Sequence, residues 1–245
     1  MENRFFKPYK GNGYHMGFFN GKKVLVLGAS HYCTYNNDSK KFNCPVWDLC
    51  TSKEIKDSSV FNATCPYNKE HHIDEMLENS ARLELENFLG DDNYTTYQNF
   101  TMALMDSFNF ADKQSVWDRL AFVNYVQYFL PSTETPVQTK DDLRNFDALL
   151  KTIDELSPDI IIIWGTKVTN HFRKNYIKKK VSKLDVQLDD HFWKLEYGKH
   201  KIIIVNSFHP SDLHGHWTRD LHQFINKFKL AINISYKDLY PDNVN

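Results

Sequence analysis

Three runs of apolar, mostly β-branched residues each end in a polar turn, and this repeated pattern constrains the fold more than any other feature of the sequence. Continuous apolar runs of four to eight residues are typical of parallel strands that are buried on both faces of a sheet. Open α/β sheets bind ligands beyond the carboxyl ends of their strands, so we expect the chemistry of this chain to lie in the three turns. The segments are 23–27 followed by 28–32, 160–163 followed by 164–166, and 202–205 followed by 206–211.

Segments with helical spacing of apolar residues separate these strands, and the alternation predicts an α/β fold. We expect a three-layer α/β/α arrangement with a central, mainly parallel four-stranded sheet and a small β-hairpin. No linker rich in Pro, Gly or Ser divides residues 1–245, which predicts a single domain. Residues 1–21 are expected to form a loop or cap, and residues 33–70 an irregular, Cys-containing insertion. The predicted helices cover 73–89, 100–108, 140–156, 168–181 and 217–232, the further strand covers 120–125, and the hairpin covers 192–197 with 201–205.

Composition limits the compartment and the partners. The formal net charge of −1 gives no global attraction to nucleic acid, although a local basic patch is compatible with it. No run approaches the roughly 18 apolar residues of a membrane span. The first residues lack the apolar stretch of a signal peptide. We therefore expect a cytoplasmic protein, or a nuclear one if the source has a nucleus, that does not associate with membranes. We also expect a monomer.

Two polar residues at strand ends are candidates for chemistry. His209 stands before Pro210 and Ser211, and a histidine held at a strand end can donate a hydrogen bond to a developing anion. The alternative is a turn histidine packed on Trp217. Asn124 interrupts an apolar strand, and its amide offers the donor and the acceptor that suit the edge of a nucleobase. The alternative is a strand-end asparagine satisfied by its neighbours.

Four motifs in order along the chain resemble those of the uracil-DNA glycosylase superfamily. The family's first turn resembles Gly-Gln-Asp-Pro-Tyr-His, its second strand ends in a base-reading Asn, its third strand ends in Leu-Leu-Trp-Gly, and its fourth carries His-Pro-Ser-Pro-Leu. The resemblance extends roughly from Lys22 to Ile232. The matching segments here are Gly28-Ala29-Ser30-His31-Tyr32-Cys33, Asn124, Ile162-Ile163-Trp164-Gly165 and His209-Pro210-Ser211-Asp212-Leu213.

This resemblance implies a DNA glycosylase of base-excision repair, which flips a damaged or unpaired base into a pocket and hydrolyses its N-glycosidic bond. Asn124 would bind the Watson–Crick edge of the base, and His209 would stabilise the base anion. Leu213 would be the apolar wedge that fills the vacated stack. The remaining roles implied are base binding by Gly28, Tyr32 (which would reject a bulky 5-substituent) and Trp164, and DNA binding by Ser211 and Gly165.

The first turn departs from the family pattern because it carries no carboxylate. Ser30 stands where the family has its water-activating acid, and a neutral hydroxyl is a poor general base. The catalytic candidates are therefore His209, Ser30 and His31, with His31 or a residue of the insertion as the substitute base. Two alternatives remain open: a non-catalytic relative that binds nucleic acid or a nucleobase, and an unrelated hydrolase with Ser30 as nucleophile and His209 as base.

The four cysteines fall within one window after the first strand. Structural disulfides are rare in a reducing cytoplasm. Four cysteines match the number of ligands of a zinc site or of the iron–sulfur cluster that some branches of the superfamily carry. The alternative is that they are small buried apolar residues. The candidate ligands are Cys33, Cys44, Cys50 and Cys65.

Overall fold

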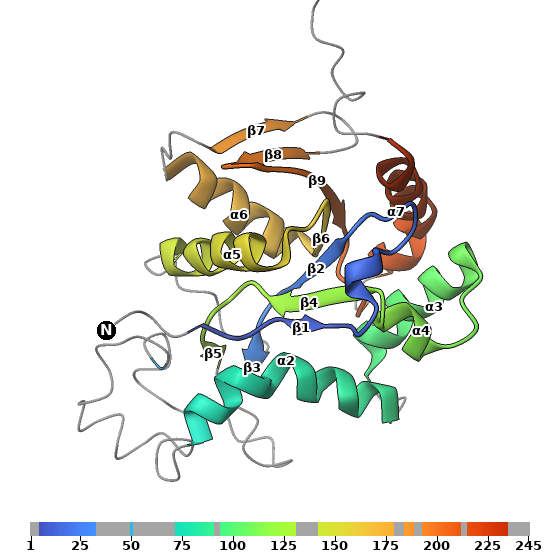
Figure 1. Ribbon diagram of the computed structural model, residues 1–245, viewed down its shortest axis with the longest axis horizontal. Coiled ribbons are helices and arrows are strands. Elements are labelled where there is room, and N and C mark those ends of the chain that lie inside the picture. Colours follow the sequence, from blue (N-terminus) through green and yellow to red (C-terminus); the bar gives the residue numbers. More distant parts are fainter. Residues whose placement is uncertain are drawn as a thin grey trace, which may run out of the picture.

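A seven-stranded sheet forms the centre of the computed structural model. Residues 5–32, 50, 72–90, 94–130, 142–178, 184–188, 193–211 and 215–234 are described. The strands follow one another across the sheet in the order β1 (Tyr9–Lys10), β4 (Leu120–Asn124), β2 (Val24–Gly28), β6 (Ile160–Trp164), β9 (His200–Ser207), β8 (Trp193–Tyr197) and β7 (Leu184–Leu188) (Figure 1).

The centre of the sheet is parallel and its two edges are antiparallel. Strands β4, β2, β6 and β9 run in one direction, β1 pairs antiparallel with β4, and β8 and β7 continue antiparallel from β9. The α/β class and the mainly parallel sheet are confirmed. The sheet is wider than the four strands expected for three reasons. The predicted hairpin joins it through β9 and adds β8, the presumed N-terminal loop contributes β1, and β7, which was not predicted, pairs with β8 at the other edge. A 3-10 turn at Tyr14–Met16 follows β1.

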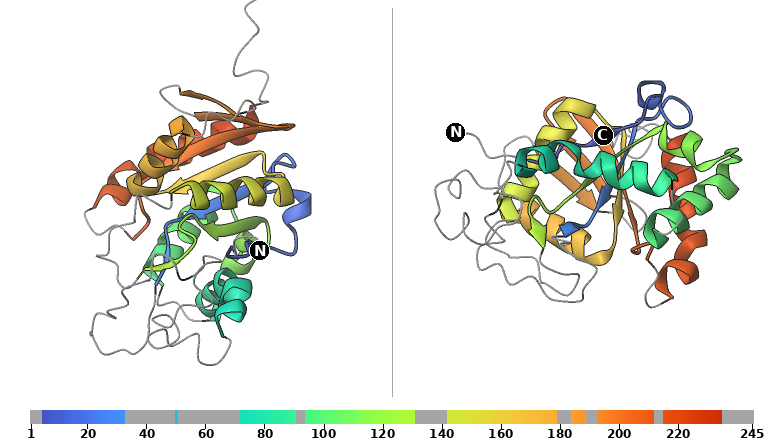
Figure 2. Two further views of the ribbon diagram at one scale, coloured as in Figure 1. Left: turned by 90° about the vertical axis from the view of Figure 1, so that its left-hand side faces the viewer. Right: turned by 90° about the horizontal axis from the view of Figure 1, so that it is seen from below.

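Alternate residues of the parallel strands contribute to two separate hydrophobic cores, because successive side chains of a strand point to opposite faces of the sheet. Val24 and Val26 of β2 face a core built with α2 (His72–Gly90), α3 (Thr95–Phe108), α4 (Lys113–Trp117) and α7 (His216–Asn233). Leu25 and Leu27 face the other core, which is covered by α5 (Asp142–Leu156) and α6 (Thr166–Lys178). The right-hand view in Figure 2 shows α5 and α6 on one side of the sheet and α3, α4 and α7 on the other. The arrangement has three layers.

The five predicted helices correspond to α2, α3, α5, α6 and α7, with ends shifted by a few residues. The described part of α6 ends at Lys178, so residues 179–181 of that prediction lie outside the described residues. Helix α4 was not predicted, because five residues show too little periodicity to be recognised. None of the helices among the described residues has the length and apolar character needed to cross a membrane.

The pairing register brings the carboxyl ends of the parallel strands to one edge. Gly28 of β2 is opposite Asn124 of β4, and Trp164 of β6 is opposite Ser207 of β9. Beyond this edge, β3 (His31–Tyr32) pairs in parallel with β5 (Phe129–Leu130) as a separate two-stranded sheet. The segment from 28 to 32, expected to be a turn, therefore contains the end of one strand and all of another.

Candidate functional site

A cavity of about 550 Å³ lies at the carboxyl edge of the parallel strands, which is where the fold predicts a ligand site. Its volume falls within the range of about 300–1,000 Å³ that is common for small-molecule sites. Its wall consists of residues of β3, β4 and the end of β6, of the segments after β2 and β9, and of the region of α2, α3, α6 and α7. The side chains that line it are Ala29, Ser30, Tyr32, Glu84, Tyr94, Thr96, Tyr97, Phe122, Asn124, Trp164, Gly165, Thr166, Lys167, Val168, Phe208, His209, Ser211 and His216.

Most of the residues selected from the sequence for catalysis, base binding or DNA binding meet in this cavity, although they come from four separate parts of the chain. Gly28 and His31 stand behind its wall and do not line it, and Leu213 lies outside the described residues. The structure thus brings the residues together, while their individual roles stay predictions. Those that line the cavity are Ser30, Tyr32, Asn124, Trp164, Gly165, His209 and Ser211.

The side chain of Asn124 is held in place from two sides. It is only 4% exposed, and its Nδ2 lies 3.2 Å and 3.3 Å from the two ring nitrogens of His31. On the other side its Oδ1 lies against Gly28, where a Cβ atom would overlap it. Gln127 Nε2 donates to the Asn124 carbonyl at 2.7 Å, and the backbone N–H of Gln127 donates to Asn145 Oδ1 at 2.9 Å. The amide is therefore preorganised at the cavity wall.

The turn that carries His209 is anchored to its surroundings. Asn99 of α3 donates to the Pro210 carbonyl at 2.7 Å, which ties the turn to the neighbouring helix. Gly165, with φ of +90°, lies next to His209, and a Cβ atom at Gly165 would be 3.2 Å from the Cβ of His209. Glycine adopts this backbone conformation without steric cost, and it leaves room for the imidazole.

Hydrogen bonding determines which nitrogen of His209 carries a proton. The backbone N–H of Ser211 lies 3.3 Å from Nδ1, and the Ser211 hydroxyl lies 2.9 Å from the same atom. Because a backbone N–H can only donate, Nδ1 is the acceptor and the proton of the neutral ring resides on Nε2. Burial lowers the pKa of His209, and the positive charge of Lys167 lowers it further. His209 is therefore a neutral donor at pH 7.

The lowered pKa of His209 predicts a pH-dependent contribution to stability. An unfolded histidine titrates near pH 6.5 and binds its proton more readily than the folded one does. This contribution is therefore complete above about pH 6.5 and is lost as the pH falls from there through the folded pKa. We expect the Tm of the wild-type protein to fall more steeply between about pH 7 and pH 5 than that of His209→Gln.

Thermal unfolding at a series of pH values checks this, with His222→Gln as the control because His222 is exposed on α7. The readout is the difference between the proteins in the slope of Tm against pH, because the groups that are not mutated contribute equally to all three slopes. Identical slopes of Tm against pH for wild type and His209→Gln would contradict the assignment of a neutral, partly buried His209.

A carboxylate that the sequence did not indicate, Glu84 of α2, projects into the cavity. Its Oε1 lies 2.6 Å from Nδ1 of His31, and its Oε2 accepts a hydrogen bond from the Tyr97 hydroxyl at 2.8 Å. Among the described residues that line the cavity, Glu84 is the sole carboxylate. No local pattern singles it out, because α2 carries several glutamates and only tertiary packing selects one.

His31 occupies an inner position in this arrangement. It is 1% exposed and packs against Phe6 with ring centroids 4.3 Å apart. A proton on Nδ1 donated to Glu84 leaves Nε2 as the acceptor for the amide of Asn124. His31, predicted as a catalytic candidate, therefore lies behind the cavity wall and connects Glu84 with Asn124.

The geometry does not favour a nucleophile–base pair of Ser30 and His209. Ser30 lines the cavity, but within the described part of the chain the hydrogen-bond partner of His209 is Ser211. A serine nucleophile is normally activated by a hydrogen bond to its base. The Ser/His hydrolase alternative thus gains no support from these contacts.

One of the four cysteines falls within the described residues. Cys50 is buried, and its Sγ accepts a hydrogen bond from the backbone N–H of Phe129 at 3.4 Å. Cys33, Cys44 and Cys65 lie outside the described residues, so the predicted zinc or iron–sulfur site stays a prediction. The described residues by themselves contain no group of three or more His, Cys, Asp or Glu side chains arranged to hold a metal.

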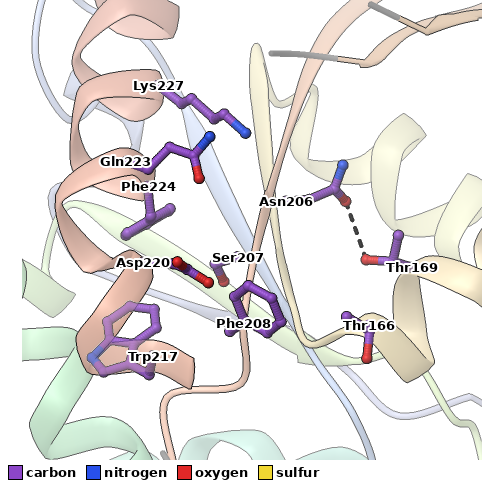
Figure 3. A pocket seen from close by; sticks show the side chains of 10 residues that line it. All are labelled: Thr166, Thr169, Asn206, Ser207, Phe208, Trp217, Asp220, Gln223, Phe224 and Lys227. Carbon is purple, nitrogen blue, oxygen red and sulfur yellow. Dashed lines mark hydrogen bonds between the residues drawn. The ribbon is translucent and has the colours of Figure 1, made fainter. Parts of the chain in front are cut away.

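A second, smaller hollow of about 210 Å³ adjoins the cavity and shares Thr166 and Phe208 with it. Figure 3 shows it between the end of β9 and helices α6 and α7, with Thr169 donating to Asn206 Oδ1 across its wall at 3.2 Å. None of the residues selected from the sequence lines this hollow. The larger cavity therefore holds the candidate chemistry.

Comparison with models of known protein families finds no match, and comparison with curated protein sequences finds no significant relative.

Proposed function

We propose that this protein is a DNA glycosylase that binds a flipped nucleobase and hydrolyses its N-glycosidic bond, as its resemblance to the uracil-DNA glycosylase superfamily implies. The observation that carries the proposal is the convergence of Asn124, His209 and the turn after β2 on one cavity. Four parallel strands each contribute one of the four motifs, and all four end at the same edge of the sheet.

In this proposal Asn124 recognises the base. Its amide is preorganised by His31 and Gly28, so it can engage the polar edge of a base without first losing side-chain freedom. Aromatic rings line the cavity and provide surfaces on which a base can stack. Tyr32 is one of these walls and would exclude a bulky 5-substituent. The others among the lining residues are Tyr94, Tyr97, Phe122, Trp164 and Phe208.

In this proposal His209 stabilises the departing base. When the bond between the sugar C1′ and the base nitrogen breaks, its electron pair stays with the base, which becomes an anion. The neutral His209 directs its single proton, on Nε2, away from the Ser211 contacts and can donate it as a hydrogen bond to that anion. A preorganised donor placed where charge develops typically contributes about 10²–10³-fold to the rate.

Residues at the rim of the cavity would contact the DNA backbone. Thr166 and Lys167, the first residues of α6, are exposed, and Ser30 and Ser211 present hydroxyls nearby. Hydroxyls, lysines and helix N-termini are common phosphate ligands in protein–DNA complexes. Leu213 remains the proposed wedge. The proposed partner is damaged or single-stranded DNA. It would be bound by these residues at the rim of the cavity, because the chain as a whole is nearly neutral.

A panel of labelled oligonucleotides tests the proposal. Single- and double-stranded oligonucleotides with one uracil, hypoxanthine or oxidised base are incubated with the protein, and abasic product is detected after alkaline cleavage. We expect abasic product from at least one lesion. The absence of product from every lesion, with binding retained, would favour the non-catalytic alternative, which the missing carboxylate of the first turn also supports.

A further inference from the structure

The proposed hydrolysis requires a group that activates water, and the first turn does not provide one. Ala29 and Ser30 occupy the positions after Gly28, and neither is a base at neutral pH. A carboxylate is the group best suited to this step, because it stabilises the oxocarbenium-like sugar and accepts the proton of the attacking water.

We propose that Glu84 of α2 is the water-activating catalytic residue of this site, a role that rests on the proposed glycosylase function. Its carboxylate lines the same cavity as Asn124 and His209, and 31% of its side chain is exposed, so water can reach it. Lys167, His209 and His216 also line the cavity. The cavity therefore contains a carboxylate for the sugar and water as well as hydrogen-bond donors for the base.

Two neighbours hold the carboxylate in a defined orientation. The short contact of 2.6 Å between Glu84 Oε1 and His31 Nδ1 is a charge-assisted hydrogen bond, and the Tyr97 hydroxyl binds the other oxygen at 2.8 Å. Burial raises the pKa of Tyr97 well above its ordinary value, and the nearby Glu84 charge raises it further, so Tyr97 stays a neutral donor. Each carboxylate oxygen keeps a second lone pair for water.

The turn after β2 thus contributes to catalysis indirectly. His31, which follows Ser30 in that turn, reaches out of β3 to bind a carboxylate from a helix more than fifty residues further along the chain. The same imidazole contacts the Asn124 amide, so the base-binding group and the proposed general base are connected through one ring. This arrangement explains why His31 is buried.

The atoms of the reaction balance with one water. The C1′–N bond breaks and its electron pair leaves with the base, while the water oxygen forms a new bond to C1′. The proton lost by that water passes to a carboxylate oxygen of Glu84 and from there through solvent to the departed base. The products are the free base and an abasic sugar, and Glu84 is regenerated as the carboxylate.

Glu84→Gln tests the proposal, because it keeps the shape of the side chain and removes its basicity. Single-turnover base release is measured on a single-stranded uracil oligonucleotide and on the hypoxanthine and oxidised-base oligonucleotides of the panel. Affinity is measured by fluorescence anisotropy with a 2′-fluoro analogue that resists cleavage.

Glu86→Gln is the matched control, since Glu86 is an exposed glutamate on the same helix and does not line the cavity. Its carboxylate pairs with Arg82 at 2.9 Å on the helix surface, with both side chains about half exposed. Exposed pairs of this kind contribute little to stability, so the control variant is expected to fold normally.

We expect Glu84→Gln to slow base release by about 10²-fold with a Kd within about threefold of wild type, and Glu86→Gln to change neither. A slowing of less than about tenfold, or a slowing with a weaker Kd, would overturn the assignment of Glu84 while the proposed function stands. Absence of base release by the wild-type protein itself would overturn the hydrolytic function, and the role of Glu84 with it.

Discussion

Replacing His209 with alanine is expected to slow base release by about 10²–10³-fold while the protein still binds DNA. The reason is that His209 offers a single proton, on Nε2, because the backbone N–H of Ser211 occupies Nδ1. Removal of this donor leaves the departing base anion without its stabilising hydrogen bond. The measurement is single-turnover base release, with affinity from fluorescence anisotropy on the non-cleavable 2′-fluoro oligonucleotide.

His222→Ala is the matched control for this experiment, because His222 belongs to α7 and is exposed. It should retain the full rate. If His209→Ala released the base as fast as wild type, the donor assigned to the base anion would be wrong, whatever the role of Glu84. A loss of DNA binding equal to the loss of rate would instead assign His209 to binding.

Gly28→Ala is expected to damage the site and the fold together. The added methyl group would overlap Asn124 Oδ1 and lie 2.8 Å from two ring carbons of Phe122, and both of these side chains are buried. Overpacking of this kind costs about 1–3 kcal/mol. Displacement of the amide would remove the hydrogen bonds proposed between Asn124 and the base, and we expect a Kd weaker by about ten- to hundredfold. Chemical denaturation and fluorescence anisotropy measure the two effects.

Gly90→Ala provides the comparison, because a Cβ at Gly90, the last residue of α2, meets no atom within 4 Å. It should leave both the affinity and the free energy of unfolding nearly unchanged. Wild-type affinity in Gly28→Ala would show that Asn124 does not bind the base in the orientation observed here.

Much of the central sheet could be predicted because its strands are continuous apolar runs. Residues 160–163 are four isoleucines, and such a run is stable only when both faces of the strand are buried. The edges of the sheet could not be predicted in the same way. Tyr9 and Lys10 form β1 because β4 offers them unpaired backbone groups, and a two-residue strand has no periodicity of its own.

His31 illustrates how a candidate site residue can be identified without its role. The sequence marked it as a catalytic candidate because it follows Ser30 in a turn that lacks the carboxylate of the resembled family. Its burial between Phe6 and Phe129, and its hydrogen bond to Glu84, depend on α2 and β5, which lie far away in the chain. The sequence suggested His31 or a residue of the insertion as a substitute base, but it could not show that Glu84 of α2 lines the cavity, because that depends on tertiary packing.

By itself the sequence determined the α/β class, the parallel strands and the polar residues at their carboxyl ends, because these depend on local periodicity and on the common direction of parallel strands. Tertiary structure alone decided that Glu84 lies in the same cavity as Asn124 and His209, and that His31 stands behind them. These relations depend on strand register and on the packing of α2 and α3 against the sheet edge, which join residues distant in the chain.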